Sequence, residues 1–141
     1  MIENEQMLIS VLEKAITCDL NNYLYDDKDS KGKLKIENVD ILDEALRKLG
    51  YTKIILIASS TLRKKIDNPK KYEEMIKQKR IIQAPALIDN DWYILELAKK
   101  LDTVILSNDK FKDYWDEFGE DWIRQRRKTF ILFEGRVFIK I

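Results

Sequence analysis

The chain has 141 residues, of which 26 are basic and 25 acidic, and this near-balance of charge (+1 net) excludes a uniformly basic nucleic-acid-binding protein. It contains no histidine, which excludes serine–histidine and cysteine–histidine catalysis as well as histidine-ligated zinc. Its single cysteine, Cys18, leaves neither a disulfide framework nor a cysteine metal site. The length is that of one domain, residues 1–141.

Helical and strand-like runs alternate along the chain. Hydrophobic spacing and turn residues predict, in order, a helix over 7–12, a strand over 15–19, a charged loop over 25–33, a helix over 41–49 and a strand over 53–58. They continue with a helix from Pro69, a strand over 80–83, a helix over 90–100, a strand over 103–106 and a hairpin over 130–139. This alternation predicts an α/β fold with a central parallel sheet and a C-terminal β-hairpin.

Acidic side chains stand where predicted strands end. Asp19 ends the first strand, Asp91 opens the helix over 90–100, and Asp109 and Asp113 follow the strand over 103–106. The carboxyl ends of parallel strands meet at one crevice, so these acids are expected to converge there. Asp109 and Asp113 would share one helical face if a helix begins at Asp109.

Converged carboxylates repel one another and supply the hard oxygen ligands that Mg²⁺ or Mn²⁺ prefers. The pattern therefore predicts a metal-dependent enzyme. The alternative for any single aspartate, such as Asp109, is that it only caps a helix.

Two basic runs are candidates for contact with phosphate groups. Arg63, Lys64 and Lys65 follow the strand over 53–58, on the edge where the acids are expected. Arg126 and Arg127 form the second run. The alternative for both runs is ordinary solvated surface charge.

Four segments together resemble the NYN branch of the PIN-like nucleases, and most of all the Zc3h12a-like (Regnase-type) ribonuclease domain. They are Asp19-x-x-Asn22, Asn90-Asp91-Trp92-Tyr93-Ile94-Leu95, the run from Ser107 to Asp113, and Trp122-Ile123-x-x-Arg126-Arg127. The resemblance extends from about Ala15 to the C-terminus and is strongest between Asp91 and Asp113.

This resemblance implies a PIN-like three-layer α/β/α sandwich and Mg²⁺-dependent endonucleolytic cleavage of single-stranded RNA. It places Asp19, Asp91, Asp109 and Asp113 at the metal centre, with Asn22 as a polar positioning residue. The chain departs from the family pattern in two ways. Asn90 stands where the family has the first of two paired acids, and the family's basic loop before that pair is absent. The departures concern RNA binding and rate more than the fold.

The leading interpretation is a metal-dependent endoribonuclease with single-stranded RNA as its partner. The alternatives are a catalytically weakened PIN-like module that binds RNA or a protein, and a toxin-type PIN nuclease that attacks a structured RNA. No segment approaches the about 20 apolar residues of a membrane span, and the acidic opening is unlike a signal peptide, which predicts a cytoplasmic protein. The resemblance also allows a homodimer.

Overall fold

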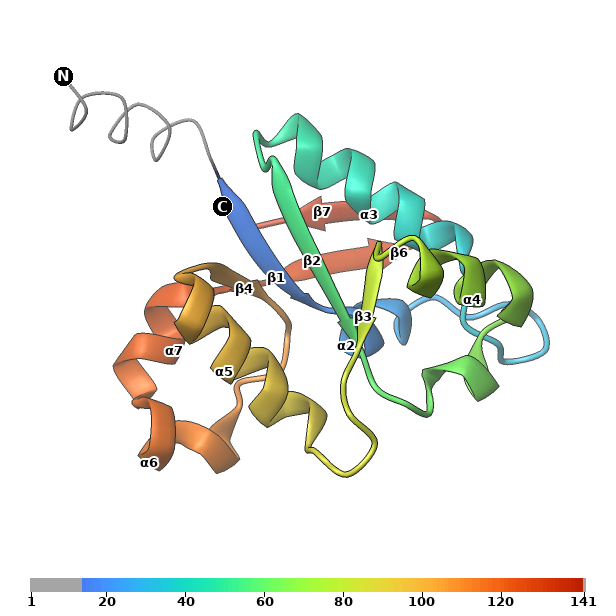
Figure 1. Ribbon diagram of the computed structural model, residues 1–141. Coiled ribbons are helices and arrows are strands. Elements are labelled where there is room, and N and C mark those ends of the chain that lie inside the picture. The colour runs from blue at the N-terminus through green and yellow to red at the C-terminus, as the bar shows by residue number, and fades with distance from the viewer. Residues whose placement is uncertain (1–13, 141) are drawn as a thin grey trace, which may run out of the picture.

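A five-stranded parallel sheet lies between two layers of helices in the computed structural model, which describes residues 14–140 (Figure 1). The strands lie in the order β3 (Ile81–Gln83), β2 (Lys53–Ala58), β1 (Ala15–Asp19), β4 (Val104–Leu106) and β5 (Arg127–Lys128). This confirms the predicted α/β fold. The helix predicted over 7–12 lies outside the described residues.

The two faces of the sheet are covered by different sets of elements. One face carries α3 (Glu37–Lys48), α4 (Pro69–Lys77) and the antiparallel hairpin of β6 (Phe130–Phe133) and β7 (Arg136–Ile139). The other carries α5 (Asn90–Leu101), α6 (Trp115–Phe118) and α7 (Glu120–Arg126). Figure 1 shows these layers on either side of the strands. The connections contain α2 (Leu20–Leu24) and the 3₁₀ turns η1 (Leu62–Lys65) and η2 (Lys112–Tyr114).

Each face of the sheet has its own hydrophobic core, because side chains alternate along a strand. On β2, Leu56 and Ala58 are buried with α3 and α4, whereas Ile55 and Ile57 are buried under α5. Cys18 is buried in the first of these cores. None of the helices in residues 14–140 is long and apolar enough to cross a membrane.

Most predicted elements occur within a residue or two of the expected bounds. The main differences are α3, which begins at Glu37 rather than at 41, and four short elements that were not predicted: the strand β5 and the helices α2, α6 and α7. The hydrophobic spacing did not indicate the first turn of α3, because the buried residues of that turn include the polar Asn38. The start of α4 is as expected, since the Asn68 side chain accepts a hydrogen bond from the Lys71 N–H and Pro69 follows it.

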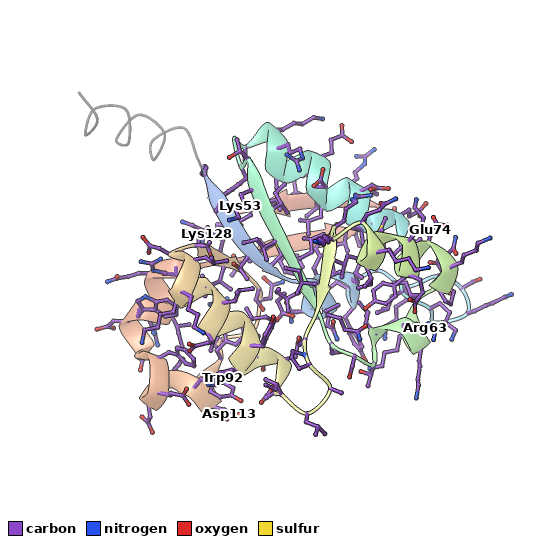
Figure 2. All side chains as sticks on the ribbon, in the orientation of Figure 1. Lys53, Arg63, Glu74, Trp92, Asp113 and Lys128 are labelled. Carbon is purple, nitrogen blue, oxygen red and sulfur yellow. The ribbon has the colours of Figure 1, made fainter. Side chains whose placement is uncertain are left out.

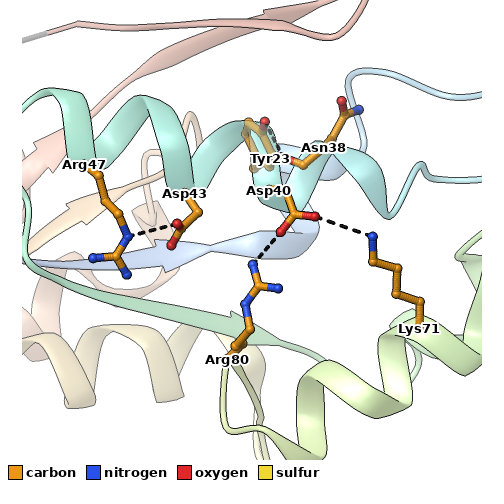
Figure 3. A network of polar contacts seen from close by, with 7 residues as sticks. All are labelled: Tyr23, Asn38, Asp40, Asp43, Arg47, Lys71 and Arg80. Carbon is orange, nitrogen blue, oxygen red and sulfur yellow. Dashed lines mark hydrogen bonds and ion pairs between the residues drawn. The ribbon is translucent and has the colours of Figure 1, made fainter.

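Polar contacts fasten α3 to its neighbours (Figure 3). Asp40 accepts from the Arg80 guanidinium at 2.5 Å and from Lys71 Nζ at 3.5 Å, which links α3 to α4 and to the segment before β3. The Tyr23 hydroxyl donates to the carbonyl of Asn38 at 2.8 Å. Because the Asp40 pairs are exposed, each contributes only about 0–1 kcal/mol.

A buried carboxylate, Asp27, joins the start of α3 to the hairpin. It accepts hydrogen bonds from Lys35 Nζ at 3.1 Å, from Asn38 Nδ2 at 3.1 Å and from the Gly135 N–H at 3.0 Å. Burial alone would raise the pKa of Asp27, but these donors outweigh it and hold the pKa below its usual value. We call this arrangement the Asp27 junction.

Candidate active site

The site begins where β1 and β4 end side by side. These strands are paired in parallel, with Cys18 opposite Leu106, so Asp19 and Ser107 follow at the same edge. The Ser107 hydroxyl donates to Asp19 Oδ2 at 2.9 Å, and the N–H of Asn22 donates to Oδ1 at 3.3 Å. Asp19 thereby caps α2, and it is only 3% exposed.

Asp109 reaches the same edge through a turn rather than a helix. Its N–H donates to Ser107 Oγ at 3.1 Å, and its Oδ1 accepts from the Phe111 N–H at 2.7 Å. Phe111 has φ +55° and a buried ring, and η2 begins only after it. No helix begins at Asp109, so the expectation that Asp109 and Asp113 share one helical face is wrong. The reason is that the Asp109 side chain satisfies the backbone locally in a non-helical turn.

Asp91 arrives from the other side of the pocket, in the first turn of α5. Asp89 caps this helix by accepting from the Asp91 N–H at 3.1 Å. The Tyr114 hydroxyl in turn donates to Asp89 Oδ2. The cap therefore holds α5 against η2 and fixes the position of Asp91.

These acids line one pocket, which we call the acidic pocket. It has a volume of about 350 Å³ and is lined by Asp19, Asn21, Asn22, Tyr25, Asp26, Ser59, Lys65, Asn90, Asp91 and Asp109. Asp113 is not among them and lies instead in an adjoining pocket with Asp91 and Asp109. Figure 2 labels Asp113 in the part of the molecule that contains α5 and α6. The structure thus brings three of the four predicted acids into the acidic pocket itself.

The electrostatics of the pocket favour protonated acids. Burial raises the pKa of Asp19 to about 6, against the opposing hydrogen bonds from Ser107 and Asn22 and with a further contribution from Asp109. Burial also raises the pKa of Asp91 to about 7, and the charges of Asp19 and Asp109 add to it. Four aspartates and one lysine line the pocket, so its carboxyl groups outnumber its cations.

Sequence reasoning missed several residues in or beside the pocket, among them Asn21, Asp26 and Ser107. Ser107 and Asn21 are polar residues within two positions of a strand end, a signal that could have identified both. Asn21 binds Ser59 at the end of β2, accepting from its N–H at 3.0 Å and donating to its hydroxyl at 2.7 Å. Asp26 was placed in a solvated loop, yet it lines the acidic pocket.

Asn22 holds the two strand ends together. Its Oδ1 accepts from the Asn108 N–H at 2.9 Å, which ties α2 to the segment after β4. Asn108 continues the chain of contacts to β6, where it exchanges hydrogen bonds with the backbone of Phe130 at 2.9 and 3.0 Å.

The pocket has donor atoms of the kind that a divalent cation requires. No three histidine, cysteine, aspartate or glutamate side chains within residues 14–140 are arranged as a ready-made metal centre. The donors present are nevertheless carboxylate and amide oxygens, the ligands of Mg²⁺ and Mn²⁺. One of them, Asn90 Oδ1, is buried and has no hydrogen-bond partner in the part of the chain that the structure describes. By their chemistry these residues fit a hard divalent cation.

The basic residues predicted to contact phosphate lie in different parts of the structure. Lys65 lines the acidic pocket, and Lys64 lines the pocket beside it. Arg63 forms an ion pair with Glu73 of α4 at 2.6 Å.

Arg126 and Arg127 are neighbours in the sequence, but their side chains bind at opposite ends of β4. Arg126 pairs with Asp102 at 2.6 Å and donates to the Thr103 carbonyl at 3.2 Å, at the amino end of β4. Arg127 donates to the Ser107 carbonyl at 3.2 Å, at the carboxyl end. Of these two, only Arg127 lies at the edge that carries the acids.

The chain matches a known family over most of its length. The family described as the Zc3h12a-like Ribonuclease NYN domain matches residues 14–138. This confirms the resemblance seen in the sequence. No curated protein gives a significant match.

Two solved structures of Arabidopsis thaliana share the fold. One, of nuclear proteinaceous RNase P 2 (PRORP2), is 20% identical, with a TM-score of 0.69 over 99% of this chain and 32% of that protein. A second structure of nuclear protein-only RNase P 2 is 19% identical, with a TM-score of 0.67 over 99% of this chain and 34% of the other. The chain therefore spans about a third of the length of these structures.

Proposed function

Because the chain belongs to the Zc3h12a-like ribonuclease NYN domain family, we propose that it is a metal-dependent endoribonuclease that hydrolyses single-stranded RNA at the acidic pocket. The observation that carries this proposal is the common pocket of Asp19, Asp91 and Asp109, which come from three separate parts of the chain. Carboxylates gathered in this way at the carboxyl edge of a parallel sheet are suited to phosphodiester chemistry.

Mg²⁺ or Mn²⁺ would be held by Asp19 and Asp109, directly or through water, with Asp113 in outer support. When bound, such an ion neutralises charge on the phosphate and lowers the pKa of a bound water. The raised pKa values of Asp19 and Asp91 support this assignment, because burial and, to a smaller extent, neighbouring carboxylates disfavour their charged forms, which a divalent cation would stabilise.

The remaining pocket residues have roles that follow from their contacts. Asp91, with a pKa of about 7, would orient and deprotonate the attacking water near neutral pH, or join the metal ligands. Lys65 would contact a phosphate oxygen of the substrate. Ser107 and Asn22 position Asp19 and the segment that carries Asp109.

Cleavage of a fluorescent, unstructured RNA in Mg²⁺ or Mn²⁺ tests the proposal, with EDTA as the metal-free control. Asp109→Asn should lower the rate at least about 100-fold, because it removes a charged oxygen donor from the pocket. Asp121→Asn makes the same change at an exposed position on α7 and should leave the rate unchanged.

Two results would contradict the proposal. RNA binding without metal-dependent cleavage would identify a catalytically weakened binding module, the reading that Asn90 and the absent basic loop favour. Cleavage confined to one structured RNA would indicate a toxin-type nuclease instead.

A further inference from the structure

A second pocket adjoins the acidic pocket and carries the opposite charge. It has a volume of about 300 Å³, and five of its lining residues are Lys28, Lys31, Lys33, Lys64 and Lys65. We call it the lysine pocket. Three of these lysines belong to the loop over 25–33, which the sequence indicated only as solvated charge.

Hydrogen bonds donated by backbone N–H groups hold the loop in place. Asp29 Oδ1 accepts from the N–H groups of Lys31 and Lys33, both at 2.9 Å, and Gly32 takes φ +78° between them. The Leu34 N–H donates to the carbonyl of Lys65 at 2.9 Å. These contacts fix the loop against η1, so lysines from two separate segments face one pocket.

The lysines of this pocket form no ion pair within the described part of the chain. None of the ion pairs among residues 14–140 includes any of the five. Lys33 Nζ donates to the carbonyl of Lys64 at 3.2 Å, and Lys28 Nζ lies 3.7 Å from the centre of the Tyr25 ring. The nearby Asp29 carboxylate is turned toward the backbone of its own turn. Gathered cations without an internal counter-charge favour an anion from outside.

Two residues belong to both pockets. Lys65 and Tyr25 line the acidic pocket as well as the lysine pocket. Tyr25 is 57% exposed, so its ring is accessible from solvent between the two pockets. An exposed ring in that place can stack a base while the phosphates on either side lie in the two pockets.

We propose that the lysine pocket is a phosphate-binding subsite for single-stranded RNA, and that Tyr25 stacks a base between this subsite and the scissile phosphate. This inference rests on the proposed function, since it extends the path of the same substrate. The ligand recognised is the repeating phosphate of a polynucleotide. An acidic peptide would satisfy the lysines but would make no use of the ring of Tyr25 or of the adjoining acidic pocket.

The test measures RNA binding without cleavage, in the full chain carrying Asp109→Asn. Fluorescence anisotropy follows fluorescein-labelled oligouridylates of two and of eight nucleotides across a range of salt concentrations. The salt slope is the slope of the logarithm of the binding constant against the logarithm of the salt concentration. Adding Lys31→Gln and Lys33→Gln should lower the magnitude of this slope for the eight-mer by about 1.4, because each phosphate contact in a single strand contributes about 0.7. The dinucleotide, too short to fill both pockets, should bind equally to both proteins.

Matched controls separate a local site from general electrostatics. Lys53→Gln with Lys77→Gln removes the same charge from exposed lysines at the opposite, amino end of the sheet, where Figure 2 labels Lys53. This pair should leave the slope unchanged. Lys31→Gln alone, whose side chain makes no hydrogen bond among the described residues, keeps the test valid if the double variant fails to fold.

Substitutions of Tyr25 test whether its ring stacks on a base. Tyr25→Leu should weaken binding of the eight-mer about 10-fold, whereas Tyr25→Phe should keep it, because stacking needs the ring and not the hydroxyl.

The inference is overturned if the eight-mer binds the lysine variant with an unchanged slope, or if the control pair lowers the slope equally. It is also overturned if the lysine substitutions weaken binding of polyglutamate but not of RNA. If the wild-type chain cleaves RNA while the lysine variant binds it normally, only this inference fails. If the wild-type chain neither binds nor cleaves RNA, the proposed function fails with it.

Discussion

Asp19 and Asp27 are both buried carboxylates, and the chain surrounds them in opposite ways. Asp27 is 8% exposed and receives three donors, one of them the ammonium group of Lys35. Asp19 is 3% exposed and receives a hydroxyl and one backbone N–H, with Asp109 close enough to raise its pKa. The pKa of Asp27 is lowered, and that of Asp19 is raised to about 6.

The difference separates a structural acid from a candidate functional one. At the Asp27 junction the fold supplies the counter-charge, so the carboxylate stabilises the contact between α3 and the hairpin. In the acidic pocket the fold gathers like charges without enough cations, which lowers stability unless a cation binds. The same residue type therefore serves two purposes. Substitution of Asp19 should lower activity without lowering stability, whereas substitution of Asp27 should lower stability without lowering activity.

The largest expected effect is on activity, at Asp19. Asp19→Asn should lower metal-dependent RNA cleavage at least about 100-fold. Its metal-free stability should be unchanged or raised, because the amide keeps a hydrogen-bond acceptor and removes a repelling charge. Cleavage rates and metal-free thermal melts measure the two effects. A large loss of stability would make Asp19 a structural cap of α2 instead.

The matching substitution at Asp27 should act on stability. Asp27→Asn removes the charge that Lys35 and the Asn38 amide bind, and should destabilise the fold by about 1.5–3 kcal/mol. Urea unfolding measures this loss, and the cleavage rate of the folded fraction should be unaffected. Equal stability of this variant and the wild type would remove the contrast between the two acids.

The pH dependence of stability should differ in sign between the two regions. For Asp19 and Asp91, whose pKa values rise from 3.8 to about 6 and about 7, the folded state retains protons that the unfolded state has lost. Their contribution to stability is present below pH 3.8 and is lost as the pH rises through 6 and 7. Asp27, whose pKa is lowered, contributes above pH 3.8 and loses its contribution as the pH falls below that value.

Thermal melts without metal should therefore be highest near pH 4, fall by a few degrees between about pH 4 and 7, and change little from there to pH 8. Saturating Mg²⁺ should reduce the fall, since it stabilises the charged pocket. A metal-free melting temperature that rises steadily to pH 8 would contradict the excess negative charge assigned to the pocket.

The sheet could be predicted from sequence because its strands are apolar runs in alternation with helices, and strand ends place Asp19 and Asp109 at one edge. The turn at Phe111 could not be predicted from the sequence. Burial of its ring offsets the cost of its left-handed backbone, about 1–2 kcal/mol, and no local pattern reveals that tertiary contact.

Residues that enter the site from loops were missed for a related reason. Asp26 and the lysines of the loop over 25–33 have the composition of solvated surface. Only the contacts between this loop and η1, such as the hydrogen bond from Leu34 to Lys65, bring them to the two pockets. Such long-range backbone pairing leaves no periodic trace in the sequence.

The most direct test of the central claim is a crystal grown or soaked with Mn²⁺ and measured for anomalous scattering. The account predicts a peak in the acidic pocket, between Asp19 and Asp109, that disappears in Asp109→Asn. No peak in this pocket at millimolar Mn²⁺, or a peak that persists unchanged in the variant, would contradict it.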